Sequence, residues 1–149
     1  MNYLSPLDML YKWEQEKPNE IYLSQPINGK WHCWTWQEFG VEVRKMAAYL
    51  KSLDLPENSK VGLLSKNCAH WMMADMAIMM SGYISVPLYP NLNSETLRKI
   101  LDHSETKLLF VGKLDNYENM KNGVPSNVQC ITFPFYSEDY PRWDDITKD

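Results

Sequence analysis

The segment Ser81–Pro90 constrains the fold more than any other stretch of this chain. An apolar, helix-like run precedes it, Gly82 ends that run, and a strand-like stretch over residues 83–86 follows at once. A rigid Pro-x-x-Pro turn, from Pro87 to Pro90, stands at the carboxyl end of the expected strand. Ligands of open α/β sheets bind at that edge. A helix that passes directly into such a strand predicts an α/β fold.

The rest of the chain repeats this alternation. Apolar runs predict strands at residues 60–65, 83–86, 107–111 and 128–133, and helical spacing predicts helices at 35–53, 69–81 and from Ser94 onward. A weakly patterned connector, residues 114–122, precedes the last strand. Alternating strands and helices favour a parallel sheet with right-handed crossovers. The predicted fold class is therefore α/β, a Rossmann-like open parallel sheet with flanking helices.

An amino-terminal helix and a β-hairpin are expected before this sheet. Ser5 and Pro6 form a good helix start, and Lys17-Pro18-Asn19 ends the element. Residues 21–23 and 30–36 flank Asn28-Gly29, which favours a tight hairpin turn. The predicted organisation of 1–149 is a helix and hairpin at 1–36, a βαβ sheet unit at 37–135 and a truncated tail at 136–149.

Two helices have distinctive patterns. Thr35 and Glu38 form a capping box before a single apolar stripe. The helix at 69–81 is apolar nearly all round and carries five of the nine methionines, so we expect it to be covered on two sides, with the methionines in the core. The hairpin tryptophans are likewise expected to pack on the domain; they are Trp31, Trp34 and Trp36.

Composition excludes several classes of protein. The 149 residues suit one domain, and aromatic residues at 13% argue against disorder. A net charge of −4 without a cluster of Lys and Arg argues against a nucleic-acid partner. The three cysteines, Cys33, Cys68 and Cys130, are widely spaced, which predicts neither a disulfide framework nor a metal site. The start of the chain carries Asp8, Lys12 and Glu14, which rules out the apolar core of a secretory signal, and the longest apolar run, residues 71–80, is too short to cross a bilayer. We therefore expect a cytoplasmic protein, and the sequence leaves peripheral membrane contact and homo-oligomers open.

No residue of the chain is predicted to be catalytic. The six glycines are isolated, so there is neither a dinucleotide fingerprint nor a P-loop. The serines lack a Gly-x-Ser-x-Gly setting, which leaves a hydrolase elbow unsupported. For His32, His70 and His103, a structural or surface role is a better interpretation than that of a general base.

Three segments together carry a family resemblance. Residues 35–39 (Thr-Trp-Gln-Glu-Phe), 64–71 (Leu-Ser-Lys-Asn-Cys-Ala-His-Trp) and the Ser81–Pro90 segment resemble the amino-terminal part of the AMP-forming acyl-CoA synthetases, in the same order and with similar spacing. Val86-Pro87-Leu88-Tyr89-Pro90, with residues 97–104 behind it, is most similar to the long-chain fatty acid type. Asp54 and Asn58-Ser59 depart from the family pattern in one turn.

The resemblance implies an activity for a longer protein. A full-length enzyme of this family would use ATP and Mg²⁺ to join a fatty acid or other carboxylic acid to AMP, and would then transfer the acyl group to CoA. The family's Ser/Thr/Gly-rich loop ending in Pro-Lys-Gly, its Tyr/Gly/Thr/Glu motif, its ribose-binding Asp and its catalytic Lys have no counterpart in these 149 residues. The isolated chain is therefore expected to be inactive and to need no cofactor.

Two loops stay as candidate binding elements. Asn67 follows one expected strand and Tyr89 follows the next, so both stand at carboxyl ends of neighbouring strands, which in the resembled family face the interior cleft. Helix capping by Asn67 and turn formation by Pro90-Asn91 explain the same residues without a ligand. No metal-binding residue is predicted.

A stand-alone α/β binding or interaction module is the alternative, since a fold does not by itself carry a function. The gene beyond Asp149 distinguishes the two hypotheses. A stop codon favours the module, and a Ser/Thr/Gly-rich loop with Pro-Lys-Gly favours the enzyme.

Overall fold

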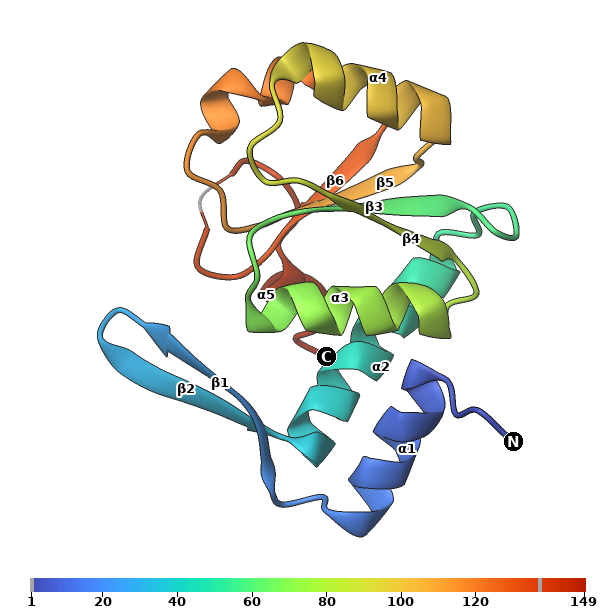
Figure 1. Cartoon of the computed structure of the whole chain (residues 1–149), viewed down its shortest axis with the longest axis vertical. Coiled ribbons are helices and arrows are strands. Elements are labelled where there is room, and N and C mark those ends of the chain that lie inside the picture. Colours follow the sequence, from blue (N-terminus) through green and yellow to red (C-terminus); the bar gives the residue numbers. More distant parts are fainter. Residues whose placement is uncertain (1, 137) are drawn as a thin grey trace.

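A parallel sheet with helices on both faces forms the centre of the computed structural model, which describes residues 2–136 and 138–149 (Figure 1). Ser137, within the expected tail, lies outside the described residues. The predicted α/β class is confirmed, with an amino-terminal helix and an antiparallel hairpin before the sheet. The four strands are parallel and lie in the order β4-β3-β5-β6: β3 (Lys60–Leu64), β4 (Ile84–Leu88), β5 (Leu108–Val111) and β6 (Gln129–Thr132).

The two faces of the sheet carry separate hydrophobic clusters. Val61 of β3 and Phe110 of β5 pack towards the first face, whereas Leu64 and Leu109 pack towards the second. The first face holds α1 (Pro6–Glu16), α2 (Trp36–Ser52), α3 (Ala69–Met80) and α5 (Trp143–Ile146). The second holds α4 (Ser94–Ser104) and the short 3₁₀ helices η1 (Tyr117–Asn119) and η2 (Lys121–Gly123).

Local capping chemistry sets the helix starts. The capping box at α2 is present: Glu38 N–H donates to the Thr35 hydroxyl at 3.1 Å, and Thr35 N–H donates to the Glu38 carboxylate at 2.8 Å. At α1, Ser5 and Asp8 form a second capping box. The sequence predicts Ser94 as the N-cap of α4, and this is wrong by one residue: Asn93 Oδ1 accepts from Thr96 N–H at 2.8 Å, which makes Asn93 the N-cap and Ser94 the first helical residue.

Strand β4 is longer than the expected run at 83–86, because it continues through Pro87 to Leu88. A proline is tolerated there since β4 is the outermost described strand and needs ladder bonds on one side only. Gly82, at φ +80°, makes the left-handed stop that precedes it, as expected. The turn then falls on Pro90 and Asn91, one step beyond the strand.

Helix α3 is covered on two sides, as expected. It packs against β3 and β4 of the sheet and against α2 and α1, and none of its residues is exposed. Met73 and Ala77 are completely buried in the first hydrophobic cluster. The other four of the five methionines are half-buried; they are Met72, Met76, Met79 and Met80. The expectation that the methionines lie in the core is therefore met in full by Met73 alone.

The hairpin consists of β1 (Ile21–Ile27) and β2 (Lys30–Thr35), and it projects beyond the sheet (Figure 1). Trp36, at the base, stacks on Tyr22 with ring centroids 3.8 Å apart, and Trp34 packs on the core. Trp31 lies near the tip and is 70% exposed, so the expectation that all three tryptophans pack is wrong for this one. The tip of the hairpin extends beyond the domain (Figure 1), which leaves Trp31 uncovered.

The tail contains an element that its sequence did not predict. Trp143 in α5 is 1% exposed, and its indole N–H donates to the Glu42 carboxylate of α2 at 3.0 Å. Lys45 also donates to the Thr147 carbonyl at 3.0 Å. Only four residues long, α5 is too short for a helical period to show in the sequence.

A close approach at Gly40 joins α1 to α2. A Cβ built on Gly40 would lie 1.6 Å from Glu14 Oε1, so the glycine leaves room for that carboxylate. Glu14 accepts two hydrogen bonds from the Arg44 guanidinium, and the second, from Nη2 to Oε2, is 2.6 Å long. This bidentate pair connects the two helices, and Glu14 in it is largely buried.

We predict that Gly40→Ala has opposite effects in two backgrounds. With Glu14 present, the new methyl group displaces the carboxylate, and the lost ion pair cancels or exceeds the gain in helix propensity. With Glu14→Ala, only the end of the flexible Arg44 side chain still lies near the new methyl group, and it can move because its partner is gone. The substitution should then raise the free energy of unfolding by about 1 kcal/mol, the propensity difference between Ala and Gly. Urea unfolding of the four variants measures the coupling, and equal effects of Gly40→Ala in both backgrounds would contradict it.

Candidate functional site

The carboxyl edge of the sheet contains a topological switch point between β3 and β5. From β3 the chain passes to β4 on one side, then returns to place β5 on the other side of β3. The loop after β3 leads to α3 on the first face, whereas the loop after β5 leads to η1 on the second. Open α/β sheets bind ligands in the crevice where two such loops diverge. We therefore take this edge as the candidate site.

Ser65 and Gly112 hold the two strand ends together. The Ser65 hydroxyl accepts from Lys113 N–H at 2.8 Å and donates to the Lys66 carbonyl at 2.7 Å. Lys66 N–H in turn donates to the Lys113 carbonyl at 2.7 Å. A Cβ on Gly112 would lie 2.5 Å from Ser65 Oγ, so only glycine permits this approach. The junction fixes where the two lysines leave the sheet, and the Lys66 side chain pairs with Asp115.

Asn67 and Tyr89, the candidates from the sequence, line one shallow hollow of about 430 Å³ that we call the proline hollow. Trp71 and two prolines, Pro87 and Pro90, complete its wall. Asn67 is exposed, and Tyr89 is 75% exposed. The N-cap of α3 is Cys68, so the alternative role of Asn67 as that cap is wrong. The structure thus brings the two candidates together, and their role in binding stays a prediction.

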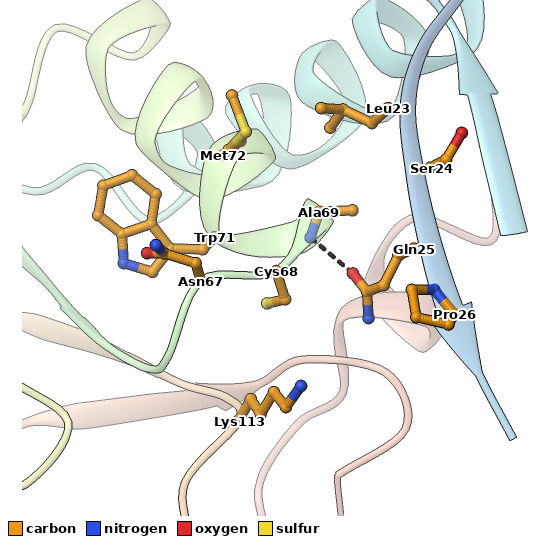
Figure 2. Close-up of a pocket in the computed structure, with 10 residues that line it drawn as sticks. All are labelled: Leu23, Ser24, Gln25, Pro26, Asn67, Cys68, Ala69, Trp71, Met72 and Lys113. Carbon is orange, nitrogen blue, oxygen red and sulfur yellow. Dashed lines mark hydrogen bonds between the residues drawn. The ribbon is translucent and has the colours of Figure 1, made fainter. Parts of the chain in front are cut away.

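A larger hollow of about 520 Å³ lies on the other side of Asn67, between β1 and the start of α3, and we call it the hairpin hollow. Figure 2 shows its lining: Leu23, Ser24, Gln25, Pro26, Asn67, Cys68, Ala69, Trp71, Met72 and Lys113. Gln25 Oε1 accepts from the Ala69 N–H at 2.7 Å, which fastens the hairpin to the first turn of α3. Sequence reasoning missed Lys113 and Gln25. The Gly112-Lys113 pair directly after an expected strand was the available signal for the lysine.

The thiol at this edge is not an activated nucleophile. Burial raises the pKa of the Cys68 thiol, against a lesser lowering by backbone N–H groups of the first turn of α3, the Ser65 hydroxyl and the Lys113 charge. The thiol is therefore protonated at neutral pH. Within residues 2–136 and 138–149 no group of three His, Cys, Asp or Glu side chains is placed to hold a metal ion. The same residues include no helix with the length and apolar character needed to cross a bilayer.

His70 follows Ala69 of the hairpin hollow in the first turn of α3, and it is 6% exposed. Aromatic rings of three other segments surround its imidazole at centroid distances of 5.3–6.1 Å; they are Trp34, Phe133, Phe135 and Trp143. Burial among these rings lowers the pKa of His70 to about 4, although the Asp144 charge opposes the shift. His32 and His103 are exposed. These positions agree with structural and surface roles for the three histidines.

Comparison with known proteins gives a consistent result. A family described as AMP-binding enzyme matches residues 10–144. The long-chain-fatty-acid–CoA ligase FadD15 of Mycobacterium bovis is 29% identical over 123 residues, which is 83% of this chain and 20% of that protein. The long chain acyl-CoA synthetase 2 of Arabidopsis thaliana is 25% identical over 134 residues, which is 85% of this chain and 20% of that protein. The chain thus spans about a fifth of the length of these curated relatives.

Solved structures share the fold. The anthranilate CoA ligase AuaEII, in complex with anthranoyl-AMP, superposes with a TM-score of 0.82 at 19% identity, over 98% of this chain and 28% of that one. A benzoate CoA ligase from Burkholderia xenovorans superposes with a TM-score of 0.79 at 15% identity, over 94% of this chain and 27% of that one. At this level of identity the likeness establishes the fold alone.

The burial of His70 predicts that the free energy of unfolding depends on pH. Its folded-state pKa of about 4 lies below the ordinary value of 6.5, so the unfolded state binds the proton more tightly. The contribution of neutral His70 to stability is therefore complete above pH 6.5 and is lost as the pH falls towards 4. Between pH 6 and pH 5 the free energy of unfolding should fall by about 1 kcal/mol.

Urea unfolding at those two pH values measures the slope. His70→Gln should flatten it, whereas His103→Gln, at an exposed position on α4, should leave it unchanged. An unaltered slope in His70→Gln would show that other groups carry the dependence.

Proposed function

The chain belongs to the AMP-binding enzyme family, and from that premise we propose that it is the amino-terminal section of an AMP-forming acid–CoA ligase acting on fatty acids. The family match over residues 10–144 carries the proposal. The names of the curated relatives, a long-chain-fatty-acid–CoA ligase and a long chain acyl-CoA synthetase, support a fatty acid as the substrate. The whole enzyme would convert the acid and ATP into an acyl-adenylate and pyrophosphate, then transfer the acyl group to CoA with release of AMP.

The described residues do not fit Mg²⁺ and a triphosphate. The six glycines are isolated along the chain, so no glycine-rich loop presents consecutive backbone amides to phosphates. The described part of the chain also places no cluster of three potential metal ligands together. We therefore assign the binding of ATP, Mg²⁺ and CoA to polypeptide outside this section, and we derive no step of the reaction through these residues.

The proposed contribution of this section is the scaffold of one wall of the cleft. Its proposed organisation is a helix and hairpin at 1–36, a sheet unit at 37–135 and a tail at 136–149, all within one larger AMP-binding domain. The carboxyl edge of the sheet would face the cleft, which would place Asn67 and Tyr89 on its surface. A cytoplasmic location stays a prediction.

One observation favours the alternative of a stand-alone binding module. The indole of Trp143 is buried between α2 and the sheet, so the described residues close a hydrophobic core of their own. Sequencing the gene downstream of the Asp149 codon distinguishes the module from the enzyme, as set out above.

The proposed ligase activity can be tested on the whole enzyme. The full open reading frame should release pyrophosphate in a fatty acid-dependent manner and consume CoA. Tyr89→Ala should lower kcat/KM by about tenfold, equivalent to about 1.4 kcal/mol, through loss of a cleft-facing contact. Tyr3→Ala, at another exposed tyrosine, in the segment before α1, is the matched control and should have no effect. Absence of both activities with acids of every chain length would refute the proposal.

The 149-residue chain alone is predicted not to bind Mg-ATP. Its melting temperature should not change in millimolar Mg-ATP, because it lacks a triphosphate cradle. A ligand at a hundred times its dissociation constant would stabilise the fold by about 2.7 kcal/mol, which corresponds to several degrees. A shift of that size, abolished by Asn67→Ala or Tyr89→Ala, would place the nucleotide at the proline hollow instead.

A further inference from the structure

Four aromatic rings form a closed cluster between the hairpin and the sheet, and we call it the four-ring cluster. His32 and Trp34 come from β2, His70 comes from α3, and Phe135 follows β6. The ring centroids are 5.8 Å apart for Phe135 and His32, 6.1 Å for Phe135 and His70, 5.9 Å for His70 and Trp34, and 6.4 Å for Trp34 and His32. Ring pairs at such distances attract each other. The cluster therefore joins the hairpin to α3 and to the segment after β6.

Phe135 takes its place in the four-ring cluster at a backbone cost. Its φ is +75°, in the left-handed region that a residue with a bulky side chain avoids. Among the non-glycine residues with positive φ in the described part of the chain, it is the only one with an aromatic side chain. The ring is 48% exposed, so burial in the core does not explain the conformation. The ring contacts with His32 and His70 offset the strain, and loss of the His32 contact would allow the backbone to relax.

The hairpin has the features of a hinged arm. It projects beyond the sheet, and the register of its ladder shifts within residues 21–23, at its base (Figure 1). An irregularity of this kind bends a strand locally. Further out, Gln25 Oε1 accepts from the Ala69 N–H at 2.7 Å (Figure 2), and the His32 ring contacts Phe135. The outer part of the arm is thus held by contacts that can break without disturbing the hydrophobic core.

We propose that the hairpin is a flap that swings about residues 21–23, and that the contact of Phe135 with His32 is its latch. The latched state has the ring contacts and the strained Phe135 backbone. In the released state the strain is relieved and the Gln25 bond to Ala69 is broken, and the hairpin hollow opens because β1 forms one of its walls. Contacts and strain that oppose each other make two states that one substitution can interconvert. The flap goes beyond the proposed function, since it involves no ligand and no step of the reaction.

The test measures the distance between the arm and the sheet by double electron–electron resonance. Spin labels are attached at Lys30→Cys on β2 and Asp102→Cys on α4, both at exposed positions of the 149-residue chain, in a background of Cys33→Ser and Cys68→Ser. This labelled chain should give a single narrow distance distribution. Phe135→Ala should add a second population at a different distance, because it removes the ring and keeps the left-handed penalty of a residue with a Cβ.

Two further variants separate the parts of the proposal. Phe135→Gly also removes the ring but has no left-handed penalty. Its ratio of released to latched molecules should therefore be about five- to thirtyfold lower than that of Phe135→Ala, the factor equivalent to that penalty. His32→Ala removes the other half of the latch from the exposed arm and should also produce the second population, even if a change at position 135 disturbs folding.

Trp31→Ala is the matched control, because Trp31 is an exposed aromatic residue of the same arm and lies outside the four-ring cluster. It should leave the distance distribution unchanged. Four outcomes would overturn the proposal: a broad distribution before any latch substitution, an unaltered one in both Phe135→Ala and His32→Ala, a second population in Trp31→Ala, or at least as much release in Phe135→Gly as in Phe135→Ala. The measurement involves neither ATP nor an acid, so its result is independent of the ligase assay.

Discussion

The burial of residues 61–64 of β3 between two neighbouring strands is the constraint on which the rest of this structure depends. Val61 and Leu63 point into the hydrophobic cluster of the first face, and Leu64 points into that of the second. Gly62 lies so close to β5 that a Cβ would come within 2.7 Å of a Leu109 methyl group. A strand that is buried on both faces needs a helix on each face. The connection after β3 therefore turns towards the first face, and the connection after β5 turns towards the second. The crevice at the carboxyl edge is a consequence of these opposite turns.

The hairpin depends on the sheet in turn. A two-stranded ribbon is at best marginally stable in water, so its position must come from contacts at its base. The Tyr22–Trp36 stack and the Gln25–Ala69 hydrogen bond supply two of them, and the edge-to-face contact of Trp34 with His70 supplies a third. Gln25 and Ala69 also line the hairpin hollow. The neutral imidazole of His70 is therefore part of the packing that positions the hairpin, and this structural role explains the residue without a catalytic one.

The sequence predicted the features that depend on local chemistry. The α2 capping box, the Asn28-Gly29 turn and the stop at Gly82 were read correctly, since each depends on a few adjacent residues. The strand order was not predicted, because an alternation of strands and helices does not say on which side of β3 each new strand is added. For the same reason the sequence brought together the ends of β3 and β4 but missed Lys113, which reaches the site from β5. The burial of Trp143 depends on contacts about a hundred residues apart, which no local pattern encodes.

Pro87 suits the outer side of β4 because a residue without an N–H costs no hydrogen bond there. Ile84 N–H donates inward to the Ser59 carbonyl at 2.9 Å, and amide directions alternate along a strand, so position 87 faces away from β3. Pro87 has no N–H to offer there, so the sheet loses no ladder bond, while an approaching strand would find no donor at that point. Proline at this position is thus compatible with the fold and also limits edge-to-edge pairing. The Pro-x-x-Pro segment that first indicated a strand end also leaves the outer side of β4, the outermost described strand, without a donor at Pro87.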